Sequence, residues 1–564
     1  MHDLVLKNGR IYDGSGLPSY RADLAVAAGR IVEIGRITGG ARRTLELDGL
    51  AVAPGFIDPH THLDAQLFWD PLATSSCFHG VTSVVIGNCG LSLAPARATD
   101  REALIKSFVR VEAISRRVLE LGVPWRWTST AEYLDAVGAR LGVNVAALVG
   151  HIAVRHCVMG EAAVERKATG DEIAEMQALV RRAMAAGAAG FSTNQNPRHM
   201  REDGLPVASR VADDAELGAL LDVLAELNTG VVQLSGGGAD SRGRIRYAAE
   251  LARRTGRPVV WQSISHSWSR PDHWREMLER TERVLAEEGL PIYAMTQAKP
   301  FENRYTLRDA QCFDEFPTWR AIMFSSLEER RKAFADPEVR RRLQSEAIDD
   351  PSPSVFPRRW DVVFVDRVKL PKNKHWERKS VAELARSRAK SGLDAFLDLA
   401  LEEDLETRFA HITTQGDPEA VCRILQHPAV VVGQSDAGAH MGYDARFGYC
   451  TAFLGRWVRD RGIMSLEEAV SKLTFKVASL FGLHDRGLLR PGLAADLVVF
   501  DPATIDTLEP EYAQDLPGGE TRMIQRALGV HHTVVNGRLV IEHGEPTGDL
   551  PGEVLRPGAP APAH

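Results

Sequence analysis

Two histidines with the spacing of a shared strand face follow a short apolar run near residue 55. His60 and His62 lie in "GFIDPHTHLD", residues 55–64. On a β-strand, residues i and i+2 project from the same face, so both imidazoles would point the same way. Pro59 lacks a backbone donor, which is typical of a strand that is ending. Two converging neutral imidazoles would form half of a metal site, and the simpler alternative is a pair of surface histidines in a loop.

Two further apolar runs end close to residues that can bind a metal. Cys89 follows "VTSVVI", and a thiolate is a soft ligand that suits zinc, although a lone buried cysteine is often only a small apolar side chain. Asp436 follows "AVVVGQS", where a buried carboxylate is costly unless it is paired or bound to a metal. Asp436 could bind the metal and accept a proton from water, or it could cap a turn. Together the strand-end residues predict a metal site.

The elements that must position these groups alternate along the chain. Apolar runs such as "VTSVVIGN", "NVAALVGH", "TGVVQLSG" and "AVVVGQSDAG" are separated by helix-like stretches such as "DEIAEMQALVRRAMAAG". Several runs are continuously apolar, which indicates strands buried on both faces, as in a parallel sheet covered by helices. Strand–helix alternation of this length predicts an α/β fold, a (β/α)8 TIM-like hydrolase barrel. In such barrels the functional side chains come from the carboxyl ends of the strands.

The sequence divides into a barrel and a second domain made from both termini. Residues 1–53 and 487–550 contain short β-rich pieces with Asn-Gly and Asp-Gly turns, and we expect them to pair into a small β-sandwich. Residues 54–486 would form the catalytic barrel. The charged, aromatic and proline-containing stretch of about 299–385 predicts an inserted lid-like region. The Pro- and Ala-rich tail, 551–564, is expected to be disordered.

Composition limits the partners and the compartment. The 564 residues carry a formal net charge of -7, so no basic surface for nucleic acid or acidic lipid is expected. The six cysteines include no CxxC pair, which favours a reducing compartment, and no signal peptide is evident, so we expect a cytoplasmic protein. No apolar run approaches the ~20 residues of a membrane helix, so no membrane partner is expected. A homo-oligomer is left open.

The motifs, taken in order, resemble the amidohydrolase superfamily. Within it they are most similar to the N-acyl-D-amino-acid deacylase (D-aminoacylase) branch. The resemblance is carried by "APGFIDPHTHLD", "GVTSVVIGNCGLSLAP", "LVGHIAVRHCVMG", "VVVGQSDAG" and "RGLLRPGLAADLVVFDP", and it covers nearly the whole chain. It implies a zinc-dependent hydrolase of carbon–nitrogen bonds other than peptide bonds. It assigns ligand roles to His60, His62 and Cys89, and makes Asp436 a ligand and the general base and acid.

This sequence departs from the branch at the ends of the fifth and sixth strands, where the resemblance implies two more ligand histidines. Strand five, "TGVVQLSGGGAD", has Gln233 and Ser235 instead. Strand six, "RPVVWQSISHSW", has Ser263 at the aligned position and His266 three residues later. His266 could still bind the metal if the strand is extended or bulged. The remaining ligands suffice for one site, so one zinc ion is favoured over two.

Four other residues are candidates near the strand ends. His151, at the expected end of the third strand, could donate a hydrogen bond to a substrate carbonyl or oxyanion, or it could be structural. Arg155 could bind a substrate carboxylate or pair with a glutamate. His199, in the loop after the fourth strand, and His440, four residues after Asp436, are candidates for substrate binding.

These residues favour one function and leave two alternatives. The leading hypothesis is hydrolysis of the amide bond of a small N-acyl-D-amino acid, or a related N-acyl compound, by metal-activated water. The lysine that the branch carries after strand six is absent from "SHSWSR", which puts the substrate in doubt. A cyclic amide or imide substrate is the first alternative. A metal-free, non-catalytic binding protein is the second. Nucleotide binding and serine-hydrolase chemistry are disfavoured because GxGxxG and GxSxG motifs are absent.

Overall fold

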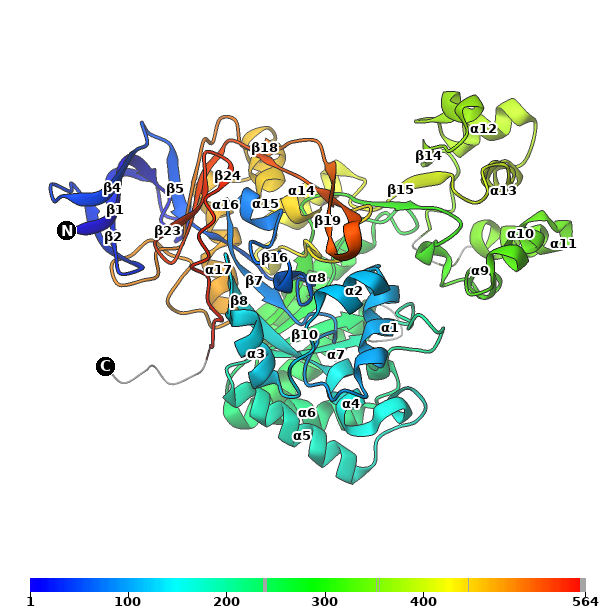
Figure 1. Cartoon of the computed structure of the whole chain (residues 1–564), viewed down its shortest axis with the longest axis horizontal. Helices are drawn as coiled ribbons and strands as arrows, with labels where there is room; N and C mark the ends of the chain where they lie inside the picture. Colours follow the sequence, from blue (N-terminus) through cyan, green and yellow to red (C-terminus); the bar gives the residue numbers. More distant parts are fainter. Residues whose placement is uncertain (237–240, 351, 353, 355, 445, 558–564) are drawn as a thin grey trace. The chain divides into compact units, whose positions relative to one another are not determined.

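The chain folds into two compact units, which are described separately (Figure 1). The computed structural model describes residues 1–236, 241–350, 352, 354, 356–444 and 446–557. The first unit comprises Met1–Ile264, Met277–Lys299 and Cys422–His564, and the second comprises Ser265–Glu276 and Pro300–Val421. In the described part of the chain, no helix is both long and apolar enough to cross a membrane.

The first unit contains the predicted parallel sheet, with eight strands that pair in chain order. They are β6 (Phe56–Asp58), β7 (Val81–Ile86), β8 (Asn144–Gly150), β9 (Gly190–Gln195), β10 (Val231–Gly236), β11 (Val259–Gln262), β12 (Ile292–Thr296) and β16 (Val430–Val432). A parallel bridge between Thr61 and Ala437 joins the segments that follow the first and the last strand. The sheet therefore curls round on itself, and the predicted barrel fold is confirmed.

Helices connect most of these strands, as alternation in the sequence predicts. The connecting helices are α1 (Arg101–Val111), α2 (Arg116–Gly122), α3 (Thr130–Gly138), α4 (His151–Met159), α5 (Gly170–Ala185), α6 (Asp214–Leu227), α7 (Ser241–Thr255), α8 (His273–Glu288) and α14 (Pro418–Gln426). Local sequence sets several of their starts. Thr169 and Glu172 form a reciprocal capping box at the start of α5, and Asp213 caps α6. After β16 follow α15 (Tyr449–Ala452), α16 (Leu466–Leu473) and α17 (Phe475–Leu480).

The barrel interior is filled by apolar side chains from nearly every strand. One buried cluster includes Ile57, Val85, Leu148, Val231, Val260, Met295 and Val431. Because side chains alternate along a strand, Gln233 lies on the same face as Val231, and Gln262 on the same face as Val260. These glutamines are therefore directed toward the interior, nearer the carboxyl ends of their strands than the apolar layer. The interior thus changes from apolar to polar at the end where His60 and Cys89 emerge.

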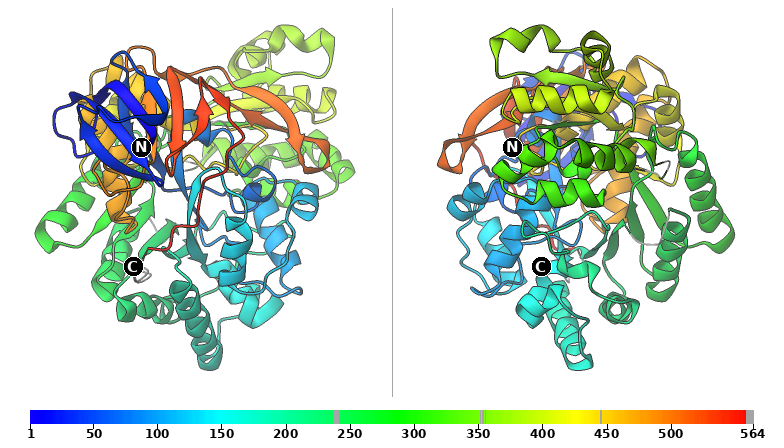
Figure 2. Two further views of the ribbon diagram at one scale, coloured as in Figure 1. Left: turned by 60° about the vertical axis from the view of Figure 1, so that its left-hand side comes forward. Right: turned by 90° about the vertical axis from the view of Figure 1, so that its right-hand side faces the viewer.

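A second sheet joins the two ends of the sequence, as predicted. Its order is β24 (Glu545–Pro546), β23 (Arg538–Glu542), β22 (Val530–Val535), β17 (Leu497–Phe500), β5 (Ala51–Pro54), β1 (His2–Ile11), β2 (Tyr20–Ala27) and β3 (Arg30–Gly35), with β4 (Ala41–Glu46) beside β1. The join between early and late strands is the antiparallel pair β5 and β17. Figure 2 shows the early strands in blue next to the late ones in orange.

The tail differs from its prediction over the part that is described. Residues 551–557, expected to be disordered, run along β8, where Val554 forms a parallel bridge with Val145. Leu555 is 6% exposed and belongs to the apolar cluster of the barrel. Proline and alanine suggested disorder, but the valine and leucine between them bury apolar surface. Residues 558–564 lie outside the described residues.

The second unit has a core of its own. Strands β13 (Phe301–Tyr305), β15 (Arg408–Thr414) and β14 (Val363–Arg367) form an antiparallel sheet, accompanied by α9 (Pro317–Met323), α10 (Leu327–Ala335), α11 (Pro337–Gln344), α12 (Val381–Arg388) and α13 (Gly392–Glu402). Its aromatic residues pack on one another, with the rings of Phe313 and Trp319 stacked at 4.0 Å. The unit contains most of the predicted insertion and extends to Val421. A lid role stays a prediction.

Candidate metal centre

Three buried side chains from two strand ends meet at the carboxyl end of the barrel. His60 and His62 follow β6, and Cys89 follows β7. One ligand atom from each residue lies within 4.8 Å of the other two. Imidazole nitrogens and a thiolate sulfur are the donors that zinc prefers in proteins. The residue types and their spacing therefore suit a metal ion.

The segment after β16 is tied to this cluster by backbone hydrogen bonds. The His62 N–H donates to the carbonyl of Ala437 at 2.7 Å, and the Asp436 N–H donates to the carbonyl of His60 at 3.2 Å. These bonds bring the Asp436 carboxylate beside the imidazole, with Oδ1 3.3 Å from His60 Nε2. The other carboxylate oxygen, Oδ2, accepts a hydrogen bond of 2.8 Å from the Arg446 guanidinium.

Cys89 is held by an unusual backbone conformation. Its φ is +56°, in the left-handed region that few non-glycine residues adopt, and such residues concentrate at functional sites. Its N–H donates to Gln233 Oε1 at 2.8 Å, so the strand-five glutamine fixes the loop. The sulfur lies 3.5 Å from His60 Nε2. Asp436, with φ +51°, has the same kind of conformation.

Burial sets the protonation states at the cluster. It lowers the pKa of His60 and of His62 to about 3, so both rings are neutral and keep a nitrogen lone pair near pH 7. Burial also raises the pKa of the Cys89 thiol well above its usual value. A bound cation would reverse that shift, because coordination to a metal deprotonates a thiol.

The polar atoms left without partners agree with a metal site. Within the described residues, Nδ1 of His62 and Oδ1 of Asp436 are buried and accept or donate no hydrogen bond. Buried polar atoms are nearly always satisfied, so two orphans in one place call for an explanation such as an ion or water. The residues present thus fit a zinc ion in both donor chemistry and unmet bonding capacity.

The two predicted substrate-binding histidines differ in their surroundings. His440 lies close to the cluster: its Nε2 is 4.0 Å from Glu112 Oε2, and its Nδ1 shares a 2.7 Å hydrogen bond with the Tyr443 hydroxyl. His199 interacts with the Asn194 side chain. It lies near enough to His62 and His440 for a positive charge on one of these rings to lower the pKa of its neighbour. Both positions are compatible with substrate contact, and that role stays a prediction.

His151 and Arg155 form a buried network instead. The His151 ring contacts Glu216 Oε1 through Nε2 at 2.9 Å and Thr193 Oγ1 through Nδ1 at 2.9 Å. Arg155 pairs with the same glutamate and donates to the carbonyl of Ala163. Both nitrogens of the catalytic candidate are therefore engaged within the fold. This geometry favours the structural alternative for His151 and for Arg155.

His266 lies in the second unit, beyond the end of β11. Its backbone N–H donates to Gln415 Oε1 at 3.1 Å, and its ring meets that of Trp268 edge-on. It is not a member of the histidine–cysteine group found among the described residues. A ligand role for His266 stays a prediction.

The comparison with protein families decides the relationship. A model described as the amidohydrolase family matches residues 43–541. The chain belongs to the amidohydrolase family.

Similar proteins and solved structures match this chain over almost its full length. The D-aminoacylase of Alcaligenes xylosoxydans xylosoxydans is 31% identical, with 98% of this chain and 97% of that protein covered. The N-acyl-D-glutamate deacylase of the same organism is 29% identical, with 98% and 96% covered. A crystal structure of D-aminoacylase matches with TM-score 0.68, 27% identity, and 99% and 100% coverage. The Bordetella bronchiseptica N-acyl-D-glutamate deacylase, complexed with zinc and a phosphonate inhibitor, matches with TM-score 0.65, 28% identity, and 98% and 99% coverage.

In this amidohydrolase, a glutamine bridges the strand-six end and the cluster. Gln262, the last residue of β11, places its side-chain Nε2 2.9 Å from His60 Nε2. Its Oε1 lies 3.3 Å from the Cys89 sulfur. Gln262 and Gln233 thus both contact Cys89, one at its side chain and the other at its backbone.

Three residues at the amidohydrolase site were missed by sequence reasoning. Glu112 follows α1, and its Oε2 lies 3.5 Å from His62 Nε2. Arg446 lies in the long segment that follows β16. Neither is marked by a strand-end pattern, so no local signal identified them. Gln262 did have a signal, because it ends an apolar run one residue before the aligned ligand position.

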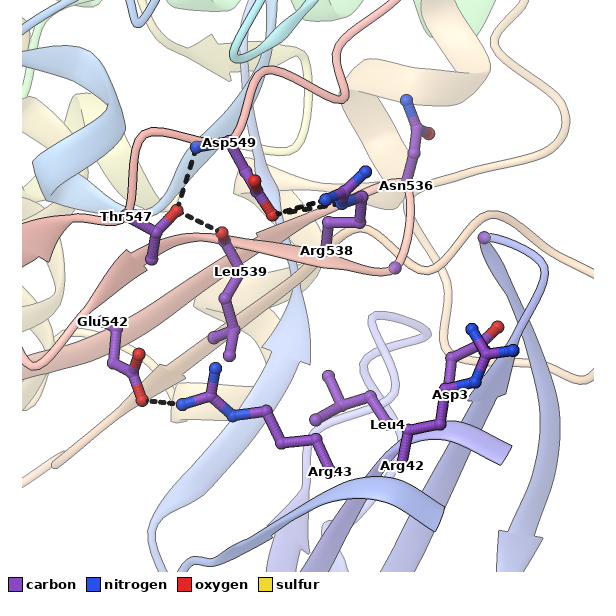
Figure 3. A pocket seen from close by; sticks show the side chains of 12 residues that line it. Asp3, Leu4, Arg42, Arg43, Asn536, Arg538, Leu539, Glu542, Thr547 and Asp549 are labelled. Carbon is purple, nitrogen blue, oxygen red and sulfur yellow. Dashed lines mark hydrogen bonds and ion pairs between the residues drawn. The ribbon is translucent and has the colours of Figure 1, made fainter. Parts of the chain in front are cut away.

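A separate pocket of about 550 Å³ lies at the sheet that the early and late strands of the amidohydrolase form together (Figure 3). Its charged lining is matched internally. Arg43 pairs with Glu542, and Arg538 with Asp549 at 3.0 Å. Because these charges already neutralise one another, the pocket has no evident preference for an anion or a cation.

Proposed function

We propose that this amidohydrolase hydrolyses the amide bond of N-acyl-D-amino acids with the help of one divalent metal ion, zinc being the expected one. The observation that carries the proposal is the cluster of His60, His62 and Cys89, with Asp436 beside it, at the carboxyl end of the barrel. The substrate class is taken from the similar proteins, which are named as D-aminoacylase and N-acyl-D-glutamate deacylase.

The roles of the ligands follow from their chemistry. His60, His62 and Cys89 would hold the ion, and Asp436 would complete the set through Oδ1. When bound, zinc supplies a Lewis acid for the acyl carbonyl and lowers the pKa of water toward about 7.

Asp436 is the group best placed to move protons. Arg446 holds Oδ2 at 2.8 Å, which fixes the orientation of the carboxylate and leaves Oδ1 directed toward His60. We assign to Asp436 the proton of the attacking water, which it then delivers to the leaving nitrogen. That delivery matters because an amide nitrogen leaves poorly unless it is protonated. His151 receives no catalytic role, because both of its ring nitrogens are engaged by Thr193 and Glu216.

One ion rather than two is supported by the glutamines of strands five and six. Gln233 Oε1 accepts a hydrogen bond from the Cys89 N–H, and the Gln262 side chain contacts both His60 and Cys89. A neutral amide is a weaker zinc ligand than imidazole, so these positions offer little to a second ion.

Metal analysis and a substrate panel test this function together. Purified protein should contain close to one zinc per chain after reconstitution, by elemental analysis. The reconstituted protein should then hydrolyse N-acetyl-D-amino acids faster than their L-enantiomers. Cyclic imides and hydantoins belong in the same panel, because they test the alternative substrate class. Protein that binds no divalent metal would refute the proposal, and turnover confined to cyclic imides would refute the substrate class.

A further inference from the structure

Asp444 is a buried carboxylate that contacts Arg446 at two places. It lies in the segment after β16, and its side chain is 7% exposed. Its Oδ1 accepts a hydrogen bond of 3.1 Å from the Arg446 backbone N–H, and its Oδ2 accepts a short hydrogen bond from Arg446 Nε. The Arg446 side chain is 3% exposed, so the pair is enclosed by the fold. Asp444 therefore constrains both the backbone and the side chain of this arginine.

The same guanidinium holds the residue that we assign to proton transfer. Arg446 Nη2 donates to Asp436 Oδ2 at 2.8 Å. The N–H groups of a guanidinium lie in one rigid plane, so a partner that fixes Nε also fixes the direction of Nη2. An arginine side chain without such a partner has several rotamers to choose from. The position of Nη2 beside Asp436 thus depends on the contact that Asp444 makes at Nε.

A buried lysine balances the second carboxylate. Asp444 and Asp436 share the single positive charge of Arg446, and buried carboxylates are costly without a counter-charge. Lys299, which follows β12, donates from Nζ to Gln525 Oε1 at 2.8 Å. Burial lowers the pKa of Lys299 to about 8, and the nearby charge of Asp444 opposes that shift. Lys299 is therefore mostly charged near pH 7 and compensates for Asp444.

We infer that Asp444 is a positioning residue for proton transfer: it orients Arg446, which in turn holds Oδ2 of Asp436. The inference rests on the proposed function, because it requires Asp436 to transfer protons. It gives Asp444 no contact with the substrate or the metal. The alternative is a purely structural ion pair, such as the buried pair of Arg486 and Asp496.

The substitution Asp444→Asn tests the inference by kinetics at saturating zinc. Asparagine keeps an oxygen for the Arg446 backbone N–H but loses the charge that strengthens the bond to Nε. We expect kcat to fall by at least about tenfold while KM stays within about threefold, because a small displacement of a reacting group is costly even when substrate binding is intact. Asp444→Glu, which keeps the charge, should recover part of the loss. Unchanged kcat in D444N would overturn the inference.

Asp496→Asn is the matched control, because it also removes the charge of a buried aspartate paired with an arginine. It should lower the melting temperature but leave kcat per folded molecule within about twofold of the wild type. An equal loss of kcat per folded molecule in D496N and D444N would assign Asp444 a structural role only and overturn the inference.

A double substitution tests whether Asp444 acts through Arg446. Arg446→Gln alone should lower kcat, and adding D444N to it should change kcat by less than about twofold, because the group through which Asp444 acts is already gone. Losses that multiply in the double variant would mean that the two residues act independently, which contradicts the inference.

Crystal structures of metal-free wild type and D444N measure the positioning without any activity. In D444N, Arg446 Nη2 should move away from Asp436 Oδ2 or occupy more than one conformer. A single conformer that keeps this contact near its present length would refute the role of Asp444. A wild type that hydrolyses no N-acyl-D-amino acid would refute the proposed function instead, and the crystal structures would still decide whether Asp444 orients Arg446.

Discussion

At the scale of single residues, the centre depends on lone pairs that burial keeps free. His60 and His62 are neutral because protonation would place a charge in a dry interior, and both therefore remain able to bind a cation near pH 7. Burial also favours the neutral form of Cys89, which for a thiol is the protonated form, so the sulfur stays protonated until a cation binds. Metal binding should consequently release a proton from this site.

Asp436→Asn tests the proton-transfer role. The amide keeps the shape of the side chain and can still receive the Arg446 hydrogen bond, but it accepts no proton. We expect kcat to fall by at least about 10³-fold, within the range of a lost general base combined with a weakened ligand. Steady-state hydrolysis of the best panel substrate provides the measurement, and circular dichroism checks the fold. Turnover near the wild-type value would remove Asp436 from the mechanism.

Cys89→Ser tests the thiolate. Serine is similar in size but does not ionise at neutral pH, so the centre loses an anionic ligand. We expect at least a tenfold loss in zinc affinity in the chelator competition. Cys157→Ser, at a half-buried cysteine on α4, is the matched control and should bind zinc normally. Equal losses in the two variants would mean that the effect is not specific to Cys89.

Sequence reasoning found the residues that follow strands and missed those that do not. His60, His62, Cys89 and Asp436 each follow an apolar run, so a local pattern points to them, and the structure brings them together. Glu112 and Arg446 arrive through a helix end and a loop, and only the folded chain shows that they lie near the cluster. The two alternatives for His151 could not be separated from sequence, because a strand-end histidine looks the same whether it faces a substrate or a buried glutamate.

At the scale of elements, the strand ends position the candidate site residues, and buried ion pairs join neighbouring helices. The continuous apolar runs predicted the parallel strands correctly, because a strand buried on both faces is apolar along its whole length. The residue that pairs with a buried charge cannot be recognised from the sequence in this way. The link from α4 to α6 through Glu216 is an example, since Glu216 looks like an ordinary residue in the first turn of a helix.

Glu216→Gln should weaken this link between helices. The variant leaves Arg155 buried without its counter-charge, and removing one partner of a buried pair costs about 3–5 kcal/mol. The free energy of unfolding from urea melts should fall by roughly that amount, toward the lower end because glutamine still accepts a hydrogen bond. Glu226→Gln, at an exposed position of the same helix, is the control. If His151 is structural, kcat per folded molecule should stay within about twofold of the wild type.

The same network predicts how stability depends on pH. Burial lowers the pKa of His151. Burial alone would raise the pKa of Glu216, but its interactions with His151 and Arg155 hold it below the usual value. Both groups therefore bind fewer protons in the folded state than in the unfolded state, so stability is lost as pH falls below about 6.5 and through the lowered values. Urea melts at neutral pH and at about pH 5 should show this loss, and it should be larger in E216Q, because Glu216 raises the pKa of His151 and its removal leaves burial to lower that pKa further.

At the scale of the whole molecule, both ends of the chain support the first unit. The short β-rich pieces at both ends predicted that early and late strands would pair in a small β-sandwich, and the structure joins them in one sheet through the pair β5 and β17. The route of residues 551–557 could not be predicted, because the strand and the apolar cluster that they contact come together only when the barrel folds. Val554 and Leu555 join β8 and the apolar interior from which the strands of the site extend.

Leu555→Ala measures what this last segment contributes. Leu555 is 6% exposed in the cluster that includes Ile57, Val85 and Val431, so its truncation leaves a cavity beneath the strands that end at the metal centre. Leucine-to-alanine changes in such cores cost about 2–5 kcal/mol. Leu17→Ala makes the same chemical change at a site that is 66% exposed, and it should alter the free energy of unfolding by less than about 0.5 kcal/mol. Equal effects of the two substitutions in urea melts would mean that the tail only rests on the surface. A large, specific loss for L555A would make residues 551–557 part of the barrel, and truncating the chain before them should then lower zinc affinity as well.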